Sequence, residues 1–121
     1  MTADHIEVGR KGEELAAEFL RQKSYRILER NWRHSRCEVD IIASNGDGLV
    51  IVEVKSRTSD EFGTPEESVD ADKRDMLIAA ANAYSEQTGA DVPLRFDIIA
   101  VDLSDKRPEI VHFEDAFYPV G

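Results

Sequence analysis

The sequence has only one cysteine in 121 residues, and it has no long apolar run. Cys37 therefore cannot form an internal disulfide, and nothing requires an oxidising compartment. The longest apolar runs, LVIV and IIAV, are far too short to span a bilayer. The opening MTADHIEVGRKGEEL lacks the apolar core of a secretory signal. We therefore expect a soluble cytoplasmic protein without a membrane partner.

An excess of basic residues is also missing, because 25 Asp and Glu outweigh 15 Lys and Arg and give a net charge of −10. Nucleic-acid-binding proteins are usually basic, since neutralising phosphates supplies much of their affinity. Residues 1–57 carry ten charges of each sign, so the whole excess lies in residues 58–121. A basic stretch in the first half is compatible with nucleic-acid contact or with a solvated face. It comprises Arg21, Lys23, Arg26, Arg30, Arg33 and Arg36.

The length and the absence of repeats or low-complexity linkers predict one domain over residues 1–121. Only the connection through the second predicted helix is long enough for a parallel crossover, so we expect an α/β fold with a mixed sheet. Ser68 is the predicted N-cap of that helix, and Gly89 is predicted to follow its last turn. Residues 58–67 are predicted to form a loop. Apolar spacing predicts helices over 12–23 and 68–88, and strands over 25–33, 38–43, 49–56, 93–103 and 109–113.

The segment EVDIIASNGDGLVIVEVKSR predicts a β-hairpin, because its Asn-Gly and Asp-Gly dipeptides favour tight turns. Two registers fit the sequence. A loop of residues 46–47 puts Asp40 directly opposite Glu53, whereas a loop of residues 45–46 puts Glu53 on the diagonal. Both registers keep Asp40, Glu53 and Lys55 on one face of the sheet.

Strict alternation along the first strand of this hairpin would put Glu38, Asp40 and Ile42 on one face and Val39 and Ile41 on the other. Two carboxylates opposite each other destabilise a strand pair unless a positive charge lies between them. A divalent cation and an ion-pair network with the neighbouring lysine both satisfy this requirement. A polar face exposed to water is the third interpretation that the spacing allows.

Two helical residues carry charge at positions expected to face the core. Glu13 shares a face with Ala16 in the first turn of the first predicted helix, and Lys73 lies on the same stripe as Leu77. Unpaired buried charge is costly, so both residues need partners. The alternative is that each lies near a helix end with its charged group in water.

An acid on a first helix, followed by D-x12-E-x-K across a hairpin, resembles the motif of the PD-(D/E)XK nuclease superfamily. Further blocks resemble, in order, those of the YraN-like family (UPF0102 type), small uncharacterised bacterial proteins related to archaeal Holliday junction resolvases. The blocks are GRKGEELAAEFL, YRILERNWR, EVDIIA, VEVKSR, Lys73 and RFDIIAV. The resemblance covers roughly residues 8–101. Cys37 replaces the family's usual glycine and Val39 its isoleucine, which leaves the carboxylates untouched.

The resemblance implies a restriction-endonuclease-like αβββαβ core, with a central mixed sheet flanked by helices. It implies an endonuclease that hydrolyses phosphodiester bonds in branched or structured DNA with Mg²⁺ or Mn²⁺. Glu13, Asp40, Glu53 and the carbonyl of Val54 would hold the metal, and Lys55 would activate the attacking water. By analogy with the resolvases, a homodimer is expected.

Residues outside the motif receive supporting roles. Glu38 is either a supporting acid or a surface residue. Arg95 and Asp97 are predicted to form an ion pair that supports the site, and the three histidines are predicted to be structural or exposed. The residues expected to contact phosphates are Arg33, Arg36, Arg57 and Lys73, and the alternative role of Lys73 is to balance the charge of the acidic cluster.

Two functions of other classes stay open on the sequence. One is a nucleic-acid-binding module that uses the same fold without cutting. The other is an interaction module whose acidic second half binds a basic protein. Salt-sensitive DNA binding would separate the two nucleic-acid functions from the third.

Overall fold

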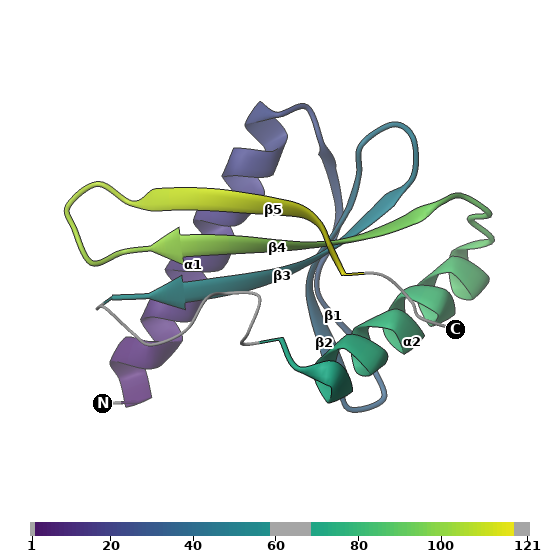
Figure 1. Cartoon of the computed structure of the whole chain (residues 1–121), viewed down its shortest axis with the longest axis horizontal. Helices are drawn as coiled ribbons and strands as arrows, with labels where there is room; N and C mark the ends of the chain where they lie inside the picture. The colour runs from purple at the N-terminus through teal and green to yellow at the C-terminus, as the bar shows by residue number, and fades with distance from the viewer. Residues whose placement is uncertain (1, 59–68, 118–121) are drawn as a thin grey trace.

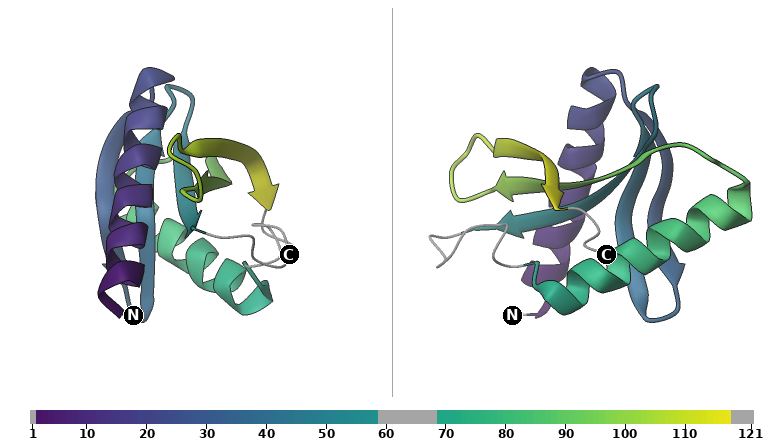
Figure 2. Two further views of the ribbon diagram at one scale, coloured as in Figure 1. Left: turned by 90° about the vertical axis from the view of Figure 1, so that its left-hand side faces the viewer. Right: turned by 45° about the vertical axis from the view of Figure 1, so that its right-hand side comes forward.

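The computed structural model describes residues 2–58 and 69–117. Five strands form one sheet in the order β1-β2-β3-β4-β5, with α1 on one face and α2 on the other (Figures 1 and 2). Only β3 and β4 are parallel, so the predicted mixed α/β sheet is confirmed and is consistent with a restriction-endonuclease-like core. The elements are α1 (Thr2–Gln22), β1 (Arg26–His34), β2 (Cys37–Ser44), β3 (Leu49–Arg57), α2 (Ala71–Thr88), β4 (Leu94–Asp102) and β5 (Glu109–Phe117).

Both helices start at residues other than those predicted. α1 begins at Thr2 instead of residue 12, and its first part has no apolar stripe, with Ile6 55% exposed. The hydrophobic period that revealed the rest of the helix is absent there. α2 is capped by Asp70, whose side chain accepts a hydrogen bond from the backbone N–H of Lys73. Ser68 and most of the predicted loop lie outside the described residues. Neither described helix is long and apolar enough to cross a membrane.

The sheet separates two apolar clusters, one under each helix. Its central strands are buried on both faces and form a rigid support. The α1 cluster comprises Ala16, Ala17, Leu20, Ile41, Ala43, Val50, Val52, Ile99 and Val101. The α2 cluster includes Val39, Ile42, Ile51, Leu77, Ala80, Ala81, Tyr84, Phe96 and Ile98.

The β2–β3 pair follows the first of the two predicted registers. The ladder runs from Ser44↔Leu49 to Ile41↔Val52, which leaves residues 46–47 as the loop. It stops one step before Asp40 would face Glu53.

Beyond that step the sheet divides. β2 continues to pair with β1 as far as Cys37, while β3 continues beside β4 as far as Arg57. In Figure 1 β3 and β4 run to the left and β5 returns to the right beside them, whereas the joined ends of β1 and β2 lie below. We call the gap where β2 and β3 diverge the fork.

Strict alternation fails at the fork. Val39 packs in the α2 cluster whereas Ile41 packs in the α1 cluster, so the prediction that they share a face is wrong. Opposite this point on β1, Asn31 has a φ of 52°, and the β1–β2 ladder passes from Arg30↔Ile41 to Trp32↔Val39. A residue with a left-handed backbone breaks the pleat of its strand. Asp40, which lies opposite on β2, therefore need not point in the direction that strict alternation predicts.

Gly12 allows α1 to approach β3 closely. A Cβ at this position would clash with Oγ of Ser56 and would lie 2.9 Å from its Cβ. Gly12→Ala is therefore expected to lower the free energy of unfolding by about 1–3 kcal/mol, because overpacking outweighs the better helix propensity of alanine. Gly9→Ala is the matched control, since a Cβ there meets nothing within 4 Å and should stabilise α1. Urea denaturation measures both, and equal stability of the two variants would contradict this packing argument.

Candidate functional site

The fork leaves the backbone of β3 without a strand partner on the β2 side. The N–H of Val54 instead donates a hydrogen bond of 2.8 Å to Oδ2 of Asp40. A buried N–H needs an acceptor, so this bond satisfies the backbone where the ladder ends. It also fixes the Asp40 carboxyl group between the diverging strands.

Glu53 is the second acid of the fork and is only 5% exposed. Its Oε2 atom lies 3.4 Å from Nζ of Lys73 and 3.7 Å from Nζ of Lys55. Among the described residues, its Oε1 atom has no hydrogen-bond partner. Lys73 of α2 was predicted to face the core and therefore to need a charged partner. Glu53 of β3 is that partner.

The two carboxyl groups are coupled electrostatically. Burial, the negative charge of Glu53 and a side-chain interaction with its carboxyl group raise the pKa of Asp40 from 3.8 to about 8. The N–H of Val54 lowers this pKa, and the charge of Glu13 adds a smaller rise. Burial lowers the pKa of Lys73, but Glu53, Cys37 and Asp40 together outweigh it, and the net pKa is raised. The metal-free pair of carboxyl groups therefore holds a proton to a higher pH than an isolated carboxyl group does, with the charged Lys73 beside Glu53.

Glu13 lies in the middle of α1, because the helix begins at Thr2; its predicted place in a first turn is wrong. Its Oε1 atom accepts a hydrogen bond of 2.8 Å from Nδ2 of Asn31. The same nitrogen lies 3.5 Å from Oε1 of Glu38, whose Oε2 pairs with Arg33 at 3.3 Å. Glu13 and Glu38 thus meet on the α1 side of the fork, joined by a residue that the sequence analysis did not single out.

The three arginines predicted to contact phosphates lie around the fork without touching the Asp40–Glu53 pair. The side chain of Arg33 is 72% exposed. Arg36 is exposed in the turn between β1 and β2. Arg57 pairs with Asp102 at the end of β3, with an Nη2–Oδ2 distance of 3.3 Å.

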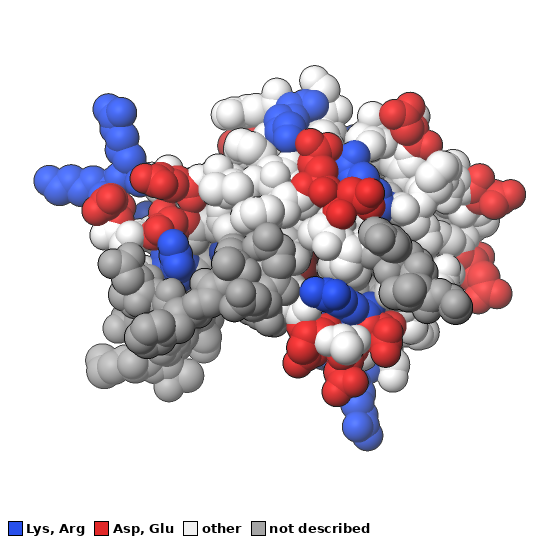
Figure 3. Space-filling view, viewed as in Figure 1, with Lys and Arg blue, Asp and Glu red and all other residues white. Residues whose placement is uncertain are grey.

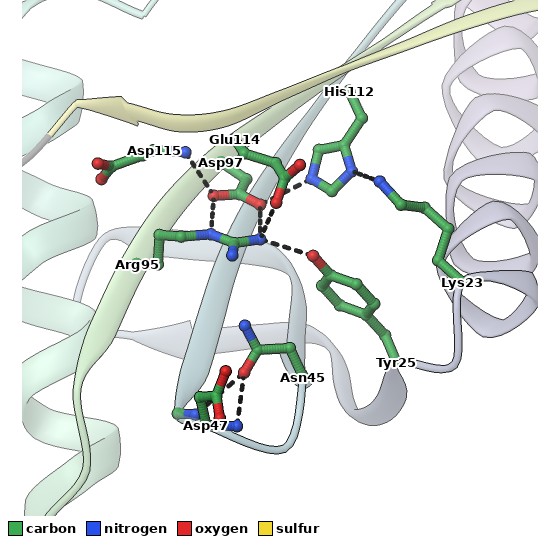
Figure 4. A network of polar contacts seen from close by, with 10 residues as sticks. Lys23, Tyr25, Asn45, Asp47, Arg95, Asp97, His112, Glu114 and Asp115 are labelled. Atoms are coloured by element: carbon green, nitrogen blue, oxygen red, sulfur yellow. Dashed lines mark hydrogen bonds and ion pairs between the residues drawn. The ribbon is translucent and has the colours of Figure 1, made fainter.

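The predicted ion pair of Arg95 and Asp97 is confirmed, as Figure 4 shows. Asp97 is fully buried and accepts two hydrogen bonds from Arg95, at 2.9 and 2.7 Å. It lies 2.7 Å from Nε2 of His112 and accepts the N–H of Asp115 at 3.0 Å.

This network joins elements far apart in the chain. Arg95 also donates to the hydroxyl of Tyr25, and His112 contacts Lys23 at 2.9 Å. His112 therefore has the structural role predicted for it. None of the fork residues takes part in these contacts, so the network stabilises the fold and does not touch the carboxylate pair.

The oxygen donors of the fork fit a hard divalent cation in chemistry. Among the described residues, no group of three or more His, Cys, Asp or Glu side chains could hold a metal ion. Mg²⁺ commonly binds through one or two carboxylates and keeps several waters, so Asp40 and Glu53 are sufficient in kind. A buried carboxylate oxygen without a partner is costly, and a cation bound at Oε1 of Glu53 would remove that cost.

Comparison with known proteins matches residues 12–101 to the family described as "Uncharacterised protein family UPF0102". A UPF0102 protein of Christiangramia forsetii is 47% identical over 96% of this chain and 98% of its own length. Relatives with the same name from Bacteroides thetaiotaomicron and Porphyromonas gingivalis are 44% and 46% identical. Their alignments cover 97% and 95% of this chain, and 97% and 87% of the relatives.

Proposed function

The chain belongs to the uncharacterised protein family UPF0102, and we propose that it is a metal-dependent endonuclease of the PD-(D/E)XK type. Its proposed substrate is branched or structured DNA, in which it hydrolyses phosphodiester bonds. One observation carries the proposal. The sheet divides around the carboxyl groups of Asp40 and Glu53, and Lys55 lies beside Glu53, whose buried Oε1 atom has no hydrogen-bond partner among the described residues.

Asp40 and Glu53 would hold Mg²⁺ or Mn²⁺, together with the backbone carbonyl of Val54. When bound, such a cation polarises the scissile phosphate and lowers the pKa of a coordinated water. Lys55 and Lys73 would supply the remaining chemistry. Lys55 donates to the attacking water or to a phosphate oxygen, where its charge stabilises the negative charge that develops on phosphorus. Lys73 neutralises Glu53 and holds its Oε2 atom, so that Oε1 is the oxygen left to bind.

The charge distribution supports a nucleic-acid substrate better than the net charge does. In Figure 3 the right-hand end, where α2 ends and β4 begins, shows acidic and no basic side chains. Glu86 and Asp91 are exposed in this region. That end lies away from the fork, so part of the acidic excess points away from the proposed DNA. Arg33, Arg36 and Arg57 lie nearer the fork and are the proposed phosphate contacts.

Titration of Mn²⁺ and Mg²⁺ by calorimetry tests the proposed metal site. We expect saturable binding that releases close to one proton near pH 6.5, because Asp40 must lose its proton to bind a cation. Asp40→Asn is expected to weaken binding at least tenfold. Asp47→Asn, an exposed acid in the turn of the same hairpin, is the matched control and should bind like the parent. Absence of binding, both alone and with a DNA junction present, would exclude the metal site.

Cleavage of junction, flap and linear duplex DNA then tests the activity itself. Lys55→Ala is expected to lower the cleavage rate about 100-fold or more while Mn²⁺ binding persists, because Lys55 acts on developing charge. A second candidate is a DNA-binding module without cleavage, which is favoured because no group of three or more acids in the described part of the chain could hold a metal ion. Salt-sensitive DNA binding without any cleavage would identify that candidate.

A further inference from the structure

Asn31 occupies an unusual backbone position for a residue within a strand. Its φ of 52° lies in the left-handed region, and the flanking pairs Arg30↔Ile41 and Trp32↔Val39 continue the β1–β2 ladder on either side. Asparagine tolerates this conformation better than most residues. The break in the strand allows the side chain of Asn31 to reach α1, as its hydrogen bond to Glu13 requires.

The amide of Asn31 joins two carboxylates that come from different elements. Its Nδ2 atom donates to Glu13 of α1 at 2.8 Å and lies 3.5 Å from Glu38 of β2. Glu38 also pairs with Arg33, whereas the amide of Asn31 is the hydrogen-bond donor recorded for Glu13 among the described residues. Asn31 lies on β1 opposite Asp40, between the flanking pairs Arg30↔Ile41 and Trp32↔Val39, so its amide holds Glu13 beside the strand that carries the first acid of the fork. Asn31 therefore controls where a third negative charge lies relative to the fork.

We propose that Asn31 is a positioning residue that fixes the Glu13 carboxylate against the metal-binding fork through its side-chain amide. This inference rests on the proposed function. A different explanation is that Asn31 merely supplies the left-handed backbone. Glycine separates the two roles, because it adopts a positive φ without strain but has no amide to donate.

The test is a double-mutant cycle of Asn31→Gly and Glu13→Gln, read as Mn²⁺ affinity by calorimetry. Asn31→Gly alone is expected to weaken Mn²⁺ binding about tenfold, as loss of a residue that orients a metal site usually does. In the Glu13→Gln background the same substitution should change the affinity less than about twofold, because Asn31 acts through Glu13. Ser35→Gly is the matched control, since Ser35 has a φ of 57° in the turn after β1 and should bind like the parent.

Urea denaturation of the same variants completes the experiment. Asn31→Gly is expected to unfold at the urea concentration of the parent, which rules out misfolding as the cause of weaker binding. Unchanged Mn²⁺ affinity of Asn31→Gly, or equal losses in both backgrounds, would overturn the positioning role while leaving the proposed function intact. A parent protein that binds no Mn²⁺ would overturn both proposals.

Discussion

Asp97→Ala is expected to lower the free energy of unfolding by about 3–5 kcal/mol, because it removes the buried carboxylate shared by three groups, an arginine, a histidine and a backbone N–H. Asp97 is fully buried, and Arg95, His112 and the N–H of Asp115 all point at its carboxylate. Such a loss is a large share of the about 5–15 kcal/mol that stabilises a typical domain. The variant should therefore be close to unfolding at 37 °C.

Urea denaturation followed by circular dichroism measures this loss. Asp91→Ala is the control, because Asp91 is exposed and a surface substitution of this kind changes stability by about 0.5 kcal/mol or less. A loss below about 1 kcal/mol for Asp97→Ala would show that the network is dispensable.

The difference in the free energy of unfolding between the parent and Asp97→Ala is expected to depend on pH. Burial raises the pKa of Asp97, but the hydrogen bonds from His112 and Arg95 outweigh it, and the net pKa lies below 3.8. A carboxyl group with a lowered pKa contributes stability above its unfolded pKa and loses it as the pH falls through its folded pKa. The difference between parent and Asp97→Ala should therefore shrink only below about pH 4.

Asp40→Asn is expected to act in the opposite direction and to raise the free energy of unfolding by about 2–5 kcal/mol at pH 9. The pKa of Asp40 is raised from 3.8 to about 8, so folding favours the protonated carboxyl group. The contribution of Asp40 to the free energy of unfolding is therefore greatest below the pKa that this residue has in the unfolded chain. It falls as the pH rises and reaches its lowest value above about pH 8. Asparagine keeps an oxygen that can accept from Val54 and never acquires the charge that opposes Glu53.

Urea denaturation of the metal-free protein at pH 4, 7 and 9 tests this expectation. Parent and Asp40→Asn should differ little at pH 4 and most at pH 9, whereas Asp47→Asn should follow the parent throughout. Saturating Mn²⁺ should then stabilise the parent but not Asp40→Asn. Equal stability at pH 9 would mean that the two acids do not oppose each other in the folded protein. A site that costs stability when empty is a common consequence of a binding function.

The local sequence determined the order of the helices and strands, and it identified the acidic residues of the fork. The Asn-Gly-Asp-Gly turn restricted the hairpin to two registers, and both kept Asp40 near Glu53 and Lys55. Apolar periodicity located the core-facing part of each helix, and the position of Gly89 marked the end of α2, where its φ is 71°. These features depend on neighbouring residues, so they can be read from the chain directly.

The tertiary structure decided where the ladder stops, which residues reach the fork and which partner each acid takes. Asp40 binds Val54 because β2 and β3 separate, and that separation depends on how β1 and β4 hold them. Glu13 turns to Asn31 because a left-handed residue breaks β1. Sequence patterns assume regular pleating and carry no information on pairings between distant segments. The chemistry of the site was therefore determined by the sequence, and its geometry by long-range packing.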